Sequence, residues 1–131
     1  MTNLDLPPGL DEIDALARAA WAKLPETFRT LAGDLVFRIE EFADEDILKE
    51  MEIEDPFELS GLYVGLELTR QSISDPNPGI PMVFLYRRPI LEEWIERGDV
   101  GLPELVAHIL VHEVGHHFGF SDAEMDRLLG D

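Results

Sequence analysis

The segment from Pro103 to Phe118 constrains the fold of this chain more than any other part of it. Apolar side chains cover nearly the whole circumference of a helix drawn through it, and a helix of that kind is buried in the middle of a domain. The apolar positions are Leu105, Val106, Ile109, Leu110, Val111, Val114 and Phe118. Pro103 suits the first turn of a helix and Glu104 suits its positive end, so the fold is predicted to form around one helix here.

The gap in this apolar circumference is polar. It holds His108, His112, Gly115 and His116, and all four histidines of the chain lie between positions 108 and 117. Polar groups without partners in a core cost stability. A row of histidines on a buried helix therefore indicates a site that uses these side chains.

Residues 112–122 read H-E-x-x-H-x-x-G-x-x-D. Two histidines four residues apart lie on one face of a helix and can bind one metal ion. Glu113, about 100° round the helix from His112, is placed to take a proton from water on that metal as the general base. Gly119 tolerates the positive φ of a chain reversal, which would bring Asp122 back as a third ligand and leave a fourth position for water.

These residues predict a hydrolase with one zinc ion per chain, bound by His112, His116 and Asp122, with Glu113 as the catalytic base. Two histidines and a carboxylate also suit non-haem iron, but a glutamate beside the first histidine on a helix is the hydrolase arrangement. An aspartate leaves less positive charge at the metal than a third histidine would. We therefore expect an activity optimum at neutral to alkaline pH.

Each of these residues also has a structural interpretation. His112 and His116 can be histidines of the core, and Glu113 can be the partner of an ion pair. Asp122 falls in the Ser-x-x-Glu capping box of residues 121–124, which would begin a final helix in which Asp122 is an acid of the first turn. The ligand role and the helix role of Asp122 are compatible.

Two further histidines have weaker assignments. His117 points about 140° from His112 around the helix, and we interpret it as a structural group or as a support for a ligand. His108 lies one turn before His112 on the same side, where it would line the cleft, orient a ligand or have no role. Tyr86, Arg87 and Arg88 are further residues that a substrate could contact, although their spacing does not require it.

The rest of the chain alternates between predicted helices and strands. Helices are predicted over Leu10–Leu24, Asp44–Met51 and Pro89–Arg97, and strands over Leu35–Ile39, Gly61–Thr69 and Met82–Tyr86. Residues 52–60 form an acidic loop and residues 74–79 a turn. Strands in the middle with helices at both ends predict the α+β class. The 131 residues suit a single domain, 1–131.

Composition excludes several classes of function. The chain has 28 acidic and 10 basic residues, and its net charge of -18 would repel nucleic acids and anionic membranes. This acidity most simply provides solubility, and the alternative is attraction of cationic substrates. No cysteine is present, which excludes disulfides and thiolate ligands. Without a signal peptide or an apolar run of membrane length, a cytoplasmic location is expected.

The segment HEVGHHFGFSDAEMD resembles a bacterial family of minimal zincin-like metallopeptidases. The pairs that carry the resemblance are His116–His117, Phe118–Gly119 and Ser121–Asp122, and the similarity extends upstream through residues 59–63 and 84–89. It implies a zincin α+β fold, in which a small mixed sheet packs on the active-site helix. It also implies zinc at His112, His116 and Asp122, with Glu113 as the base.

Three functional hypotheses follow. The first is a zinc-dependent peptidase that cleaves a peptide or protein substrate. The second is a zincin-fold module that binds a metal or a partner with little proteolysis, because metzincins place a methionine turn beneath the metal and only residues 123–131 follow Asp122. The third is an acidic domain without a metal. No feature of the sequence specifies a substrate or an oligomeric state.

Overall fold

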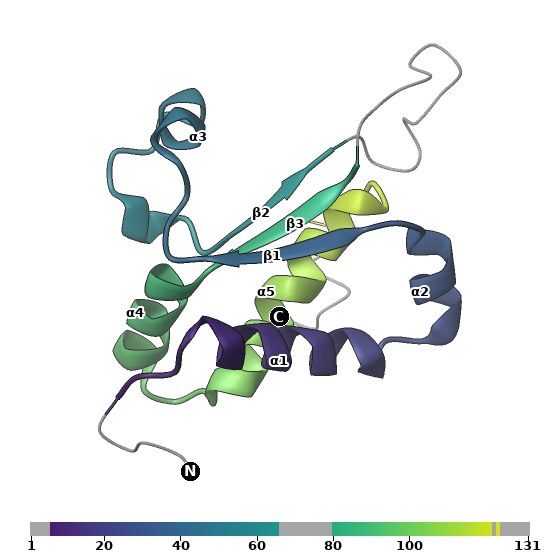
Figure 1. The fold of residues 1–131 in the computed structure, drawn as a ribbon, viewed down its shortest axis with the longest axis horizontal. Helices are drawn as coiled ribbons and strands as arrows, with labels where there is room; N and C mark the ends of the chain where they lie inside the picture. Colours follow the sequence, from purple (N-terminus) through teal and green to yellow (C-terminus); the bar gives the residue numbers. More distant parts are fainter. Residues whose placement is uncertain (1–5, 66–79, 122, 124–131) are drawn as a thin grey trace.

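A small mixed sheet forms the middle of the computed structural model, which describes residues 6–65, 80–121 and 123 (Figure 1). Within these residues the sheet has three strands in the order β1-β3-β2. They are β1 (Val36–Glu40), β2 (Gly61–Val64) and β3 (Met82–Tyr86). β1 runs parallel to the central strand β3, and β2 runs antiparallel to it. The predicted α+β class with a small mixed sheet is therefore confirmed.

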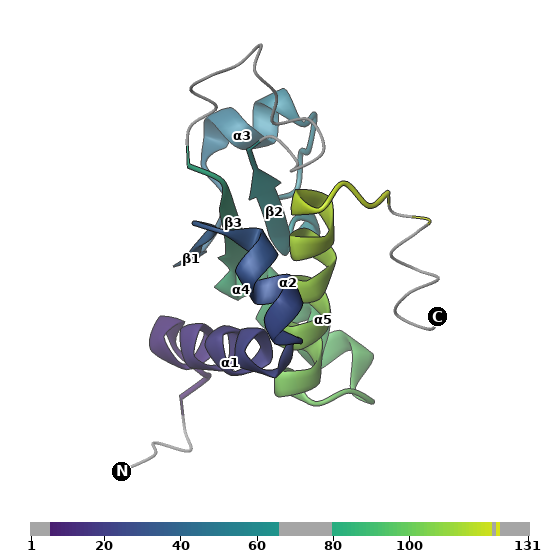
Figure 2. The same ribbon diagram turned by 90° about the vertical axis from the view of Figure 1, so that its right-hand side faces the viewer.

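Helices lie on both sides of this sheet. α1 (Leu10–Lys23) and α5 (Leu102–His117) pack against one face of it and against each other (Figures 1 and 2). α3 (Glu45–Glu50) and the short 3-10 helix η1 (Pro56–Glu58) lie toward the other face. α2 (Glu26–Ala32) connects α1 to β1, and α4 (Arg87–Arg97) follows β3 directly.

The alternation of side chains along β3 separates two hydrophobic cores. Val83 and Leu85 face α1 and α5 and are completely buried, whereas Phe84 and Tyr86 face α3. The main core consists of buried residues from α1, β3, α4 and α5: Ile13, Ala17, Val83, Leu85, Ile90, Leu91, Leu102, Leu105, Val106, Ile109, Leu110 and Val114. The second core is smaller and includes the buried residues Ala43, Leu59 and Tyr86.

α5 is the buried helix that the sequence predicts. It begins at Leu102, one residue before Pro103, with Gly101 as its N-cap. Its buried apolar side chains pack in the main core. No helix in the described ranges is long and apolar enough to cross a membrane.

Most predicted elements are present with small differences at their ends. β3 matches its prediction. β2 ends at Val64, and Gly65 directly after it is a bend with φ +146°. Residues 66–69 of the predicted strand, the turn at 74–79 and, apart from Ala123, the predicted final helix lie outside the described residues. α2 was not predicted, because Pro25 comes directly after the predicted helix Leu10–Leu24, where a proline indicates that a helix ends. In the structure Pro25 is also the N-cap of α2, which ends at Gly33 with φ +68°.

Tyr86 introduces an unsatisfied polar group into the second core. Its ring is completely buried and lies parallel to that of Phe84, with 6.1 Å between the ring centroids. Its hydroxyl has no hydrogen-bond partner among the described residues. Burial, together with the carboxylates of Glu40, Asp44 and Glu113, raises the pKa of this phenol above its ordinary value of 10.0.

We predict that Tyr86→Phe raises the free energy of unfolding by about 1 kcal/mol, because it removes a buried donor without a partner and keeps the ring. Above pH ~10 the unfolded wild-type chain loses the phenol proton that folded Tyr86 retains, so the stability of the wild type falls as the pH rises. The difference in free energy of unfolding between Tyr86→Phe and the wild type should therefore grow in this range. Urea denaturation at neutral and alkaline pH measures both effects.

Tyr63→Phe is the matched control, because the hydroxyl of Tyr63 lies 2.7 Å from Nδ1 of His117 and is hydrogen-bonded. That variant should lose stability where Tyr86→Phe gains it. A Tyr86→Phe protein less stable than the wild type would contradict the assignment of an unsatisfied hydroxyl.

Candidate functional site

The two motif histidines meet on the second half of α5. Their one-turn spacing brings the imidazoles of His112 and His116 to 5.0 Å between ring centroids, with 83° between the ring planes. Both side chains are half-buried, as is Glu113 between them. The helix thus presents two ring nitrogen donors and a carboxylate at one partly enclosed location.

The end of α5 turns the chain back toward His116. The helix closes at Phe118, and Gly119 adopts φ +89°. The Gly119 N–H donates to the carbonyl of His116 and the Phe120 N–H to that of Gly115, both at 3.0 Å. This pair of bonds is a Schellman motif, in which the residue with positive φ is usually glycine. The positive φ predicted for Gly119 is confirmed.

This turn sets the tautomer of His116. Nδ1 of His116 lies 3.2 Å from the carbonyl oxygen of Phe120. A carbonyl only accepts, so Nδ1 carries the proton, and in a neutral imidazole the lone pair is then on Nε2. Metal-binding histidines are commonly oriented by such a bond from the second ring nitrogen to a carbonyl. His116 therefore fits a role as a zinc ligand through Nε2.

The edge strand β2 passes close to Glu113. A Cβ atom at Gly61 would lie 2.8 Å from Cγ2 of Ile109 and 3.2 Å from Cγ of Glu113. The first distance is shorter than real Cβ contacts, and a β-branched isoleucine in a helix has little rotamer freedom to move away. Glycine at position 61 is thus required for this approach, a requirement that the sequence alone did not reveal.

The peptide groups of Gly61 point away from the sheet. Tyr86 N–H donates to the carbonyl of Ser60 at 3.0 Å, and Gly61 is opposite Leu85 in the antiparallel register. Hydrogen-bonded and non-bonded pairs alternate in such a ladder, so the N–H and C=O of Gly61 are directed toward the outer edge of β2. This edge lies next to Glu113.

A cavity of about 310 Å³ joins these parts. Its lining comes from η1, the start of β2, α4 and α5, and consists of Glu58, Leu59, Ser60, Gly61, Glu93, His108, Ile109, His112 and Glu113. His108 is exposed and lines the cavity, as one of its interpretations anticipated. His112 and Glu113 of α5 and the start of β2 thus line one open cavity, which we call the motif cavity.

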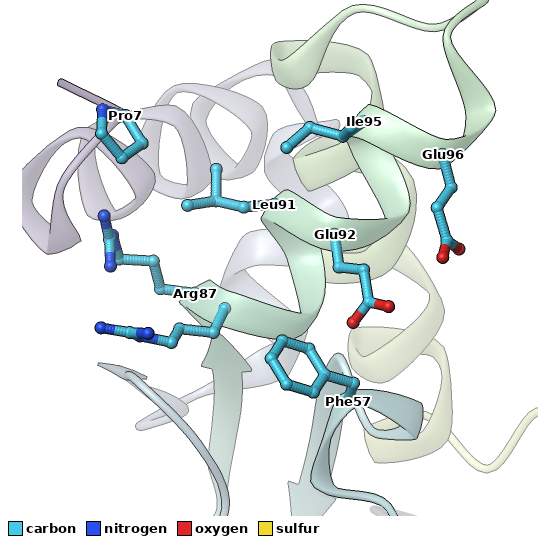
Figure 3. Close-up of a pocket in the computed structure, with 8 residues that line it drawn as sticks. Pro7, Phe57, Arg87, Leu91, Glu92, Ile95 and Glu96 are labelled. Carbon is cyan, nitrogen blue, oxygen red and sulfur yellow. The ribbon is translucent and has the colours of Figure 1, made fainter. Parts of the chain in front are cut away.

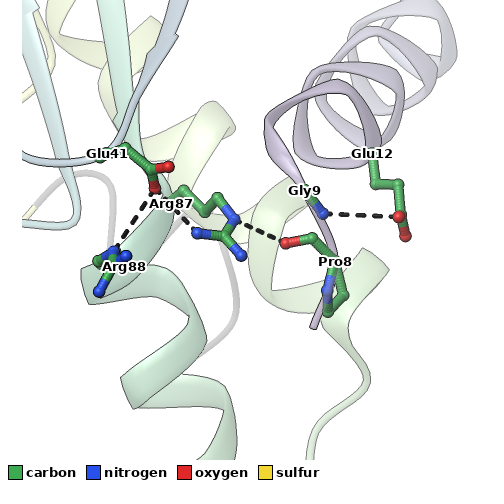
Figure 4. Close-up of polar contacts among 6 residues, drawn as sticks. All are labelled: Pro8, Gly9, Glu12, Glu41, Arg87 and Arg88. Atoms are coloured by element: carbon green, nitrogen blue, oxygen red, sulfur yellow. Dashed lines mark hydrogen bonds and ion pairs between the residues drawn. The ribbon is translucent and has the colours of Figure 1, made fainter. Parts of the chain in front are cut away.

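A larger cavity, of about 620 Å³, lies beside α4 and contains none of the motif residues (Figure 3). Arg87 and Arg88 line it and do not line the motif cavity. Arg87 donates to the carbonyl of Pro8 at 2.7 Å and to Glu41 at 2.9 Å, and Arg88 lies 3.8 Å from Glu41 (Figure 4). Arg87 thus connects α4 to the segment before α1, both arginines pair with Glu41, and neither lines the motif cavity.

The contacts of His117 indicate a structural role. Its side chain is completely buried, Nε2 lies 2.9 Å from the carbonyl oxygen of Ala32, and Nδ1 lies 2.7 Å from the hydroxyl of Tyr63. Because the carbonyl only accepts, Nε2 carries the proton and Nδ1 accepts from Tyr63. His117 therefore connects the end of α5 to β2 and to the end of α2.

The third predicted ligand, Asp122, lies outside the described residues. Within those residues, no group of three or more histidine, aspartate or glutamate side chains is arranged to hold a metal ion. The ligand set of His112, His116 and Asp122 consequently stays a prediction, of which the structure describes the two histidines.

Comparison with protein families identifies one that spans most of the chain. A family model described as zincin-like metallopeptidase matches residues 32–130, which include all three strands and α5. The resemblance inferred from the motif is thereby confirmed, together with the zincin-like fold. The family implies zinc binding and peptidase chemistry in general. No curated protein matches the sequence.

We predict that Gly119→Ala weakens zinc binding about 10- to 100-fold, as loss of support to a metal ligand does. An alanine at φ +89° is strained, and relief of the strain moves the Phe120 carbonyl away from His116. Competition with a chromophoric chelator measures the affinity.

Gly98→Ala is the control, since Gly98 ends α4 with φ +68° and no atom would contact its new Cβ within 4 Å. Both variants should lose about 1 kcal/mol of stability, but only Gly119→Ala should lose affinity for zinc. Equal affinities in the two variants would refute a link between this turn and the metal.

We predict that His117→Phe lowers the free energy of unfolding by about 2–4 kcal/mol, because it removes the partner of the buried Ala32 carbonyl and of the half-buried Tyr63 hydroxyl. The same substitution at exposed His108 on the same helix should change stability by less than about 0.5 kcal/mol. Chemical denaturation of both variants tests the difference. Similar losses in the two proteins would argue against the structural role.

Proposed function

The chain belongs to the zincin-like metallopeptidase family, and we propose that it is a zinc-dependent peptidase acting on a peptide or protein substrate. One observation carries the proposal. The motif cavity brings His112 and Glu113 of α5 together with the outward-facing edge of β2 at Gly61. This arrangement supports the proposal, because a candidate metal ligand, a candidate general base and a backbone edge that can pair with a peptide line the same cavity.

The donor set supports zinc. His112 and His116 supply two imidazole nitrogens, and we propose Asp122 as the third ligand, which leaves the open position of a catalytic site for one ion per chain. Zinc bound there would supply a Lewis acid that acidifies water and polarises a peptide carbonyl. The Nδ1–H of His116 on the Phe120 carbonyl holds this imidazole in the orientation that binding requires.

Glu113 is the proposed general base. It follows His112 directly, and its carboxylate oxygen Oε2 would lie 3.4 Å from a Cβ at Gly61, so it sits between the metal-binding face and β2. From this position the carboxylate accepts a proton from the attacking water and returns it to the leaving amine.

The edge of β2 is the proposed binding surface for the substrate backbone. The N–H and C=O of Gly61 point outward, and an extended peptide can add to such an edge as a further strand. Main-chain pairing at Gly61 would hold the scissile bond beside Glu113.

We predict that Glu113→Gln abolishes peptide hydrolysis, with a loss of about 10²- to 10⁴-fold or more, and retains one zinc ion per chain. The amide cannot accept the proton, whereas the proposed ligands are unchanged. Turnover of a mixed peptide library and metal content by mass spectrometry provide the two measurements.

His116→Ala is the companion variant and should lose the metal together with the activity. Bound zinc in the wild type without turnover of any peptide would favour the second hypothesis, a module that binds a metal or a partner. Undiminished hydrolysis by Glu113→Gln would overturn the proposed mechanism.

A further inference from the structure

We propose that the motif cavity selects substrates with a lysine or arginine side chain next to the scissile bond, and that Glu58 and Glu93 determine this preference. This inference rests on the peptidase function proposed above. The site itself is defined by the motif histidines and the edge of β2. The carboxylates decide which side chain of a bound peptide is favoured in it.

The charge of the cavity lining is one-sided. Three carboxylates line it, Glu58 from η1, Glu93 from α4 and Glu113 from α5. No lysine or arginine occurs among the described residues that line it. Three separate elements thus contribute negative charge to the space beside the proposed metal ligands. Glu113 is the proposed general base. Glu58 and Glu93 remain to interact with the substrate.

The ion pair described for Glu93 neutralises little of the charge of that carboxylate. The one ion pair described for Glu93 is with Arg97, at 3.5 Å and four residues along α4, and both side chains are 40% or more exposed. Pairs of this kind contribute little, because water screens them and the long side chains lose freedom. Arg97 also lies 4.0 Å from Asp99. A cationic side chain entering the cavity can therefore bind Glu93 without displacing a strong partner.

The size of the cavity suits one side chain. Its volume of about 310 Å³ is at the lower end of the range for ligand sites. A peptide paired along Gly61 would direct alternate side chains to the two faces of the extended sheet. A side chain on the α5 face would enter the motif cavity, where an aliphatic stem can lie along Ile109 and a terminal cation can reach the carboxylates.

The net charge of the whole chain also favours substrates with basic side chains. A net charge of -18 raises the local concentration of cationic peptides and repels acidic ones. If the acidity served only solubility, Glu58 and Glu93 would behave like any other exposed carboxylates. Peptides that differ only in charge would then be cleaved at similar rates at moderate salt, when long-range attraction is screened.

The test is cleavage of one peptide series by the full zinc-loaded chain at moderate salt. The residues on the two sides of the scissile bond are each varied among lysine, arginine, glutamine and glutamate. At one of the two positions, kcat/KM for lysine or arginine should exceed that for glutamine by about two- to fivefold, the effect of a single ion pair with a partly exposed carboxylate. Glutamate should be the poorest substrate.

Substitution of the two carboxylates tests whether they cause the preference for lysine and arginine. Glu58→Gln and Glu93→Gln should each reduce the ratio of lysine to glutamine, and the double variant should remove it. Glu104→Gln is the control, because Glu104 is an exposed carboxylate of α5 that does not line the motif cavity. It removes the same charge from the chain and should leave the ratio unchanged.

A second measurement separates failure of this inference from failure of the proposed function. Binding of the same peptides, labelled with a fluorophore, to zinc-loaded Glu113→Gln reports selectivity without hydrolysis. Tighter binding of the lysine peptide, lost in Glu58→Gln and Glu93→Gln, would support the inference even if no peptide is cleaved, and would overturn only the peptidase function. Cleavage and binding that are indifferent to charge would overturn the inference and leave the function intact.

Discussion

The burial of α5 is the constraint on which the rest of the structure depends. A helix that is apolar on most sides needs cover on most sides, and α1, β3 and α4 provide it through one continuous core. His112, Glu113 and His116 occupy the side that the core leaves open and are only half-buried. The same packing that stabilises the helix thus restricts its polar residues to one face beside β2. The site is a consequence of how the core closes.

Two glycines allow the backbone to support this face. Gly61 lets β2 approach Ile109 and Glu113 more closely than any side chain would permit. Gly119 provides the positive φ that returns the chain to His116 and sets its tautomer. His117 secures the other side of the same helical turn to Tyr63 and Ala32. The main chain at these two glycines therefore helps to position His116 and Glu113.

The sequence predicts the parts of this arrangement that depend on local pattern. The apolar circumference of α5, the apolar run that forms β3 and the turn at Gly119 are each visible within a few residues. α2 was missed because Pro25 serves two helices at once. The role of Gly61 was not predictable, because it depends on contact with α5 some fifty positions away, and a glycine in a strand carries no sign of its neighbour. Asp122 stays a prediction from spacing alone.

The carboxylates of the motif cavity, the predicted metal and the proposed substrate preference form one electrostatic arrangement. Like charges that share a small cavity repel one another, so Glu58, Glu93 and Glu113 favour any cation that enters. A zinc ion at the predicted histidine ligands would relieve part of this repulsion, and a basic side chain would relieve more of it farther from the metal. Ligands that bind only the folded state also stabilise it. An acidic cavity on an acidic chain is therefore expected to be most stable when both cations are bound, which couples occupancy of the site to the integrity of the fold.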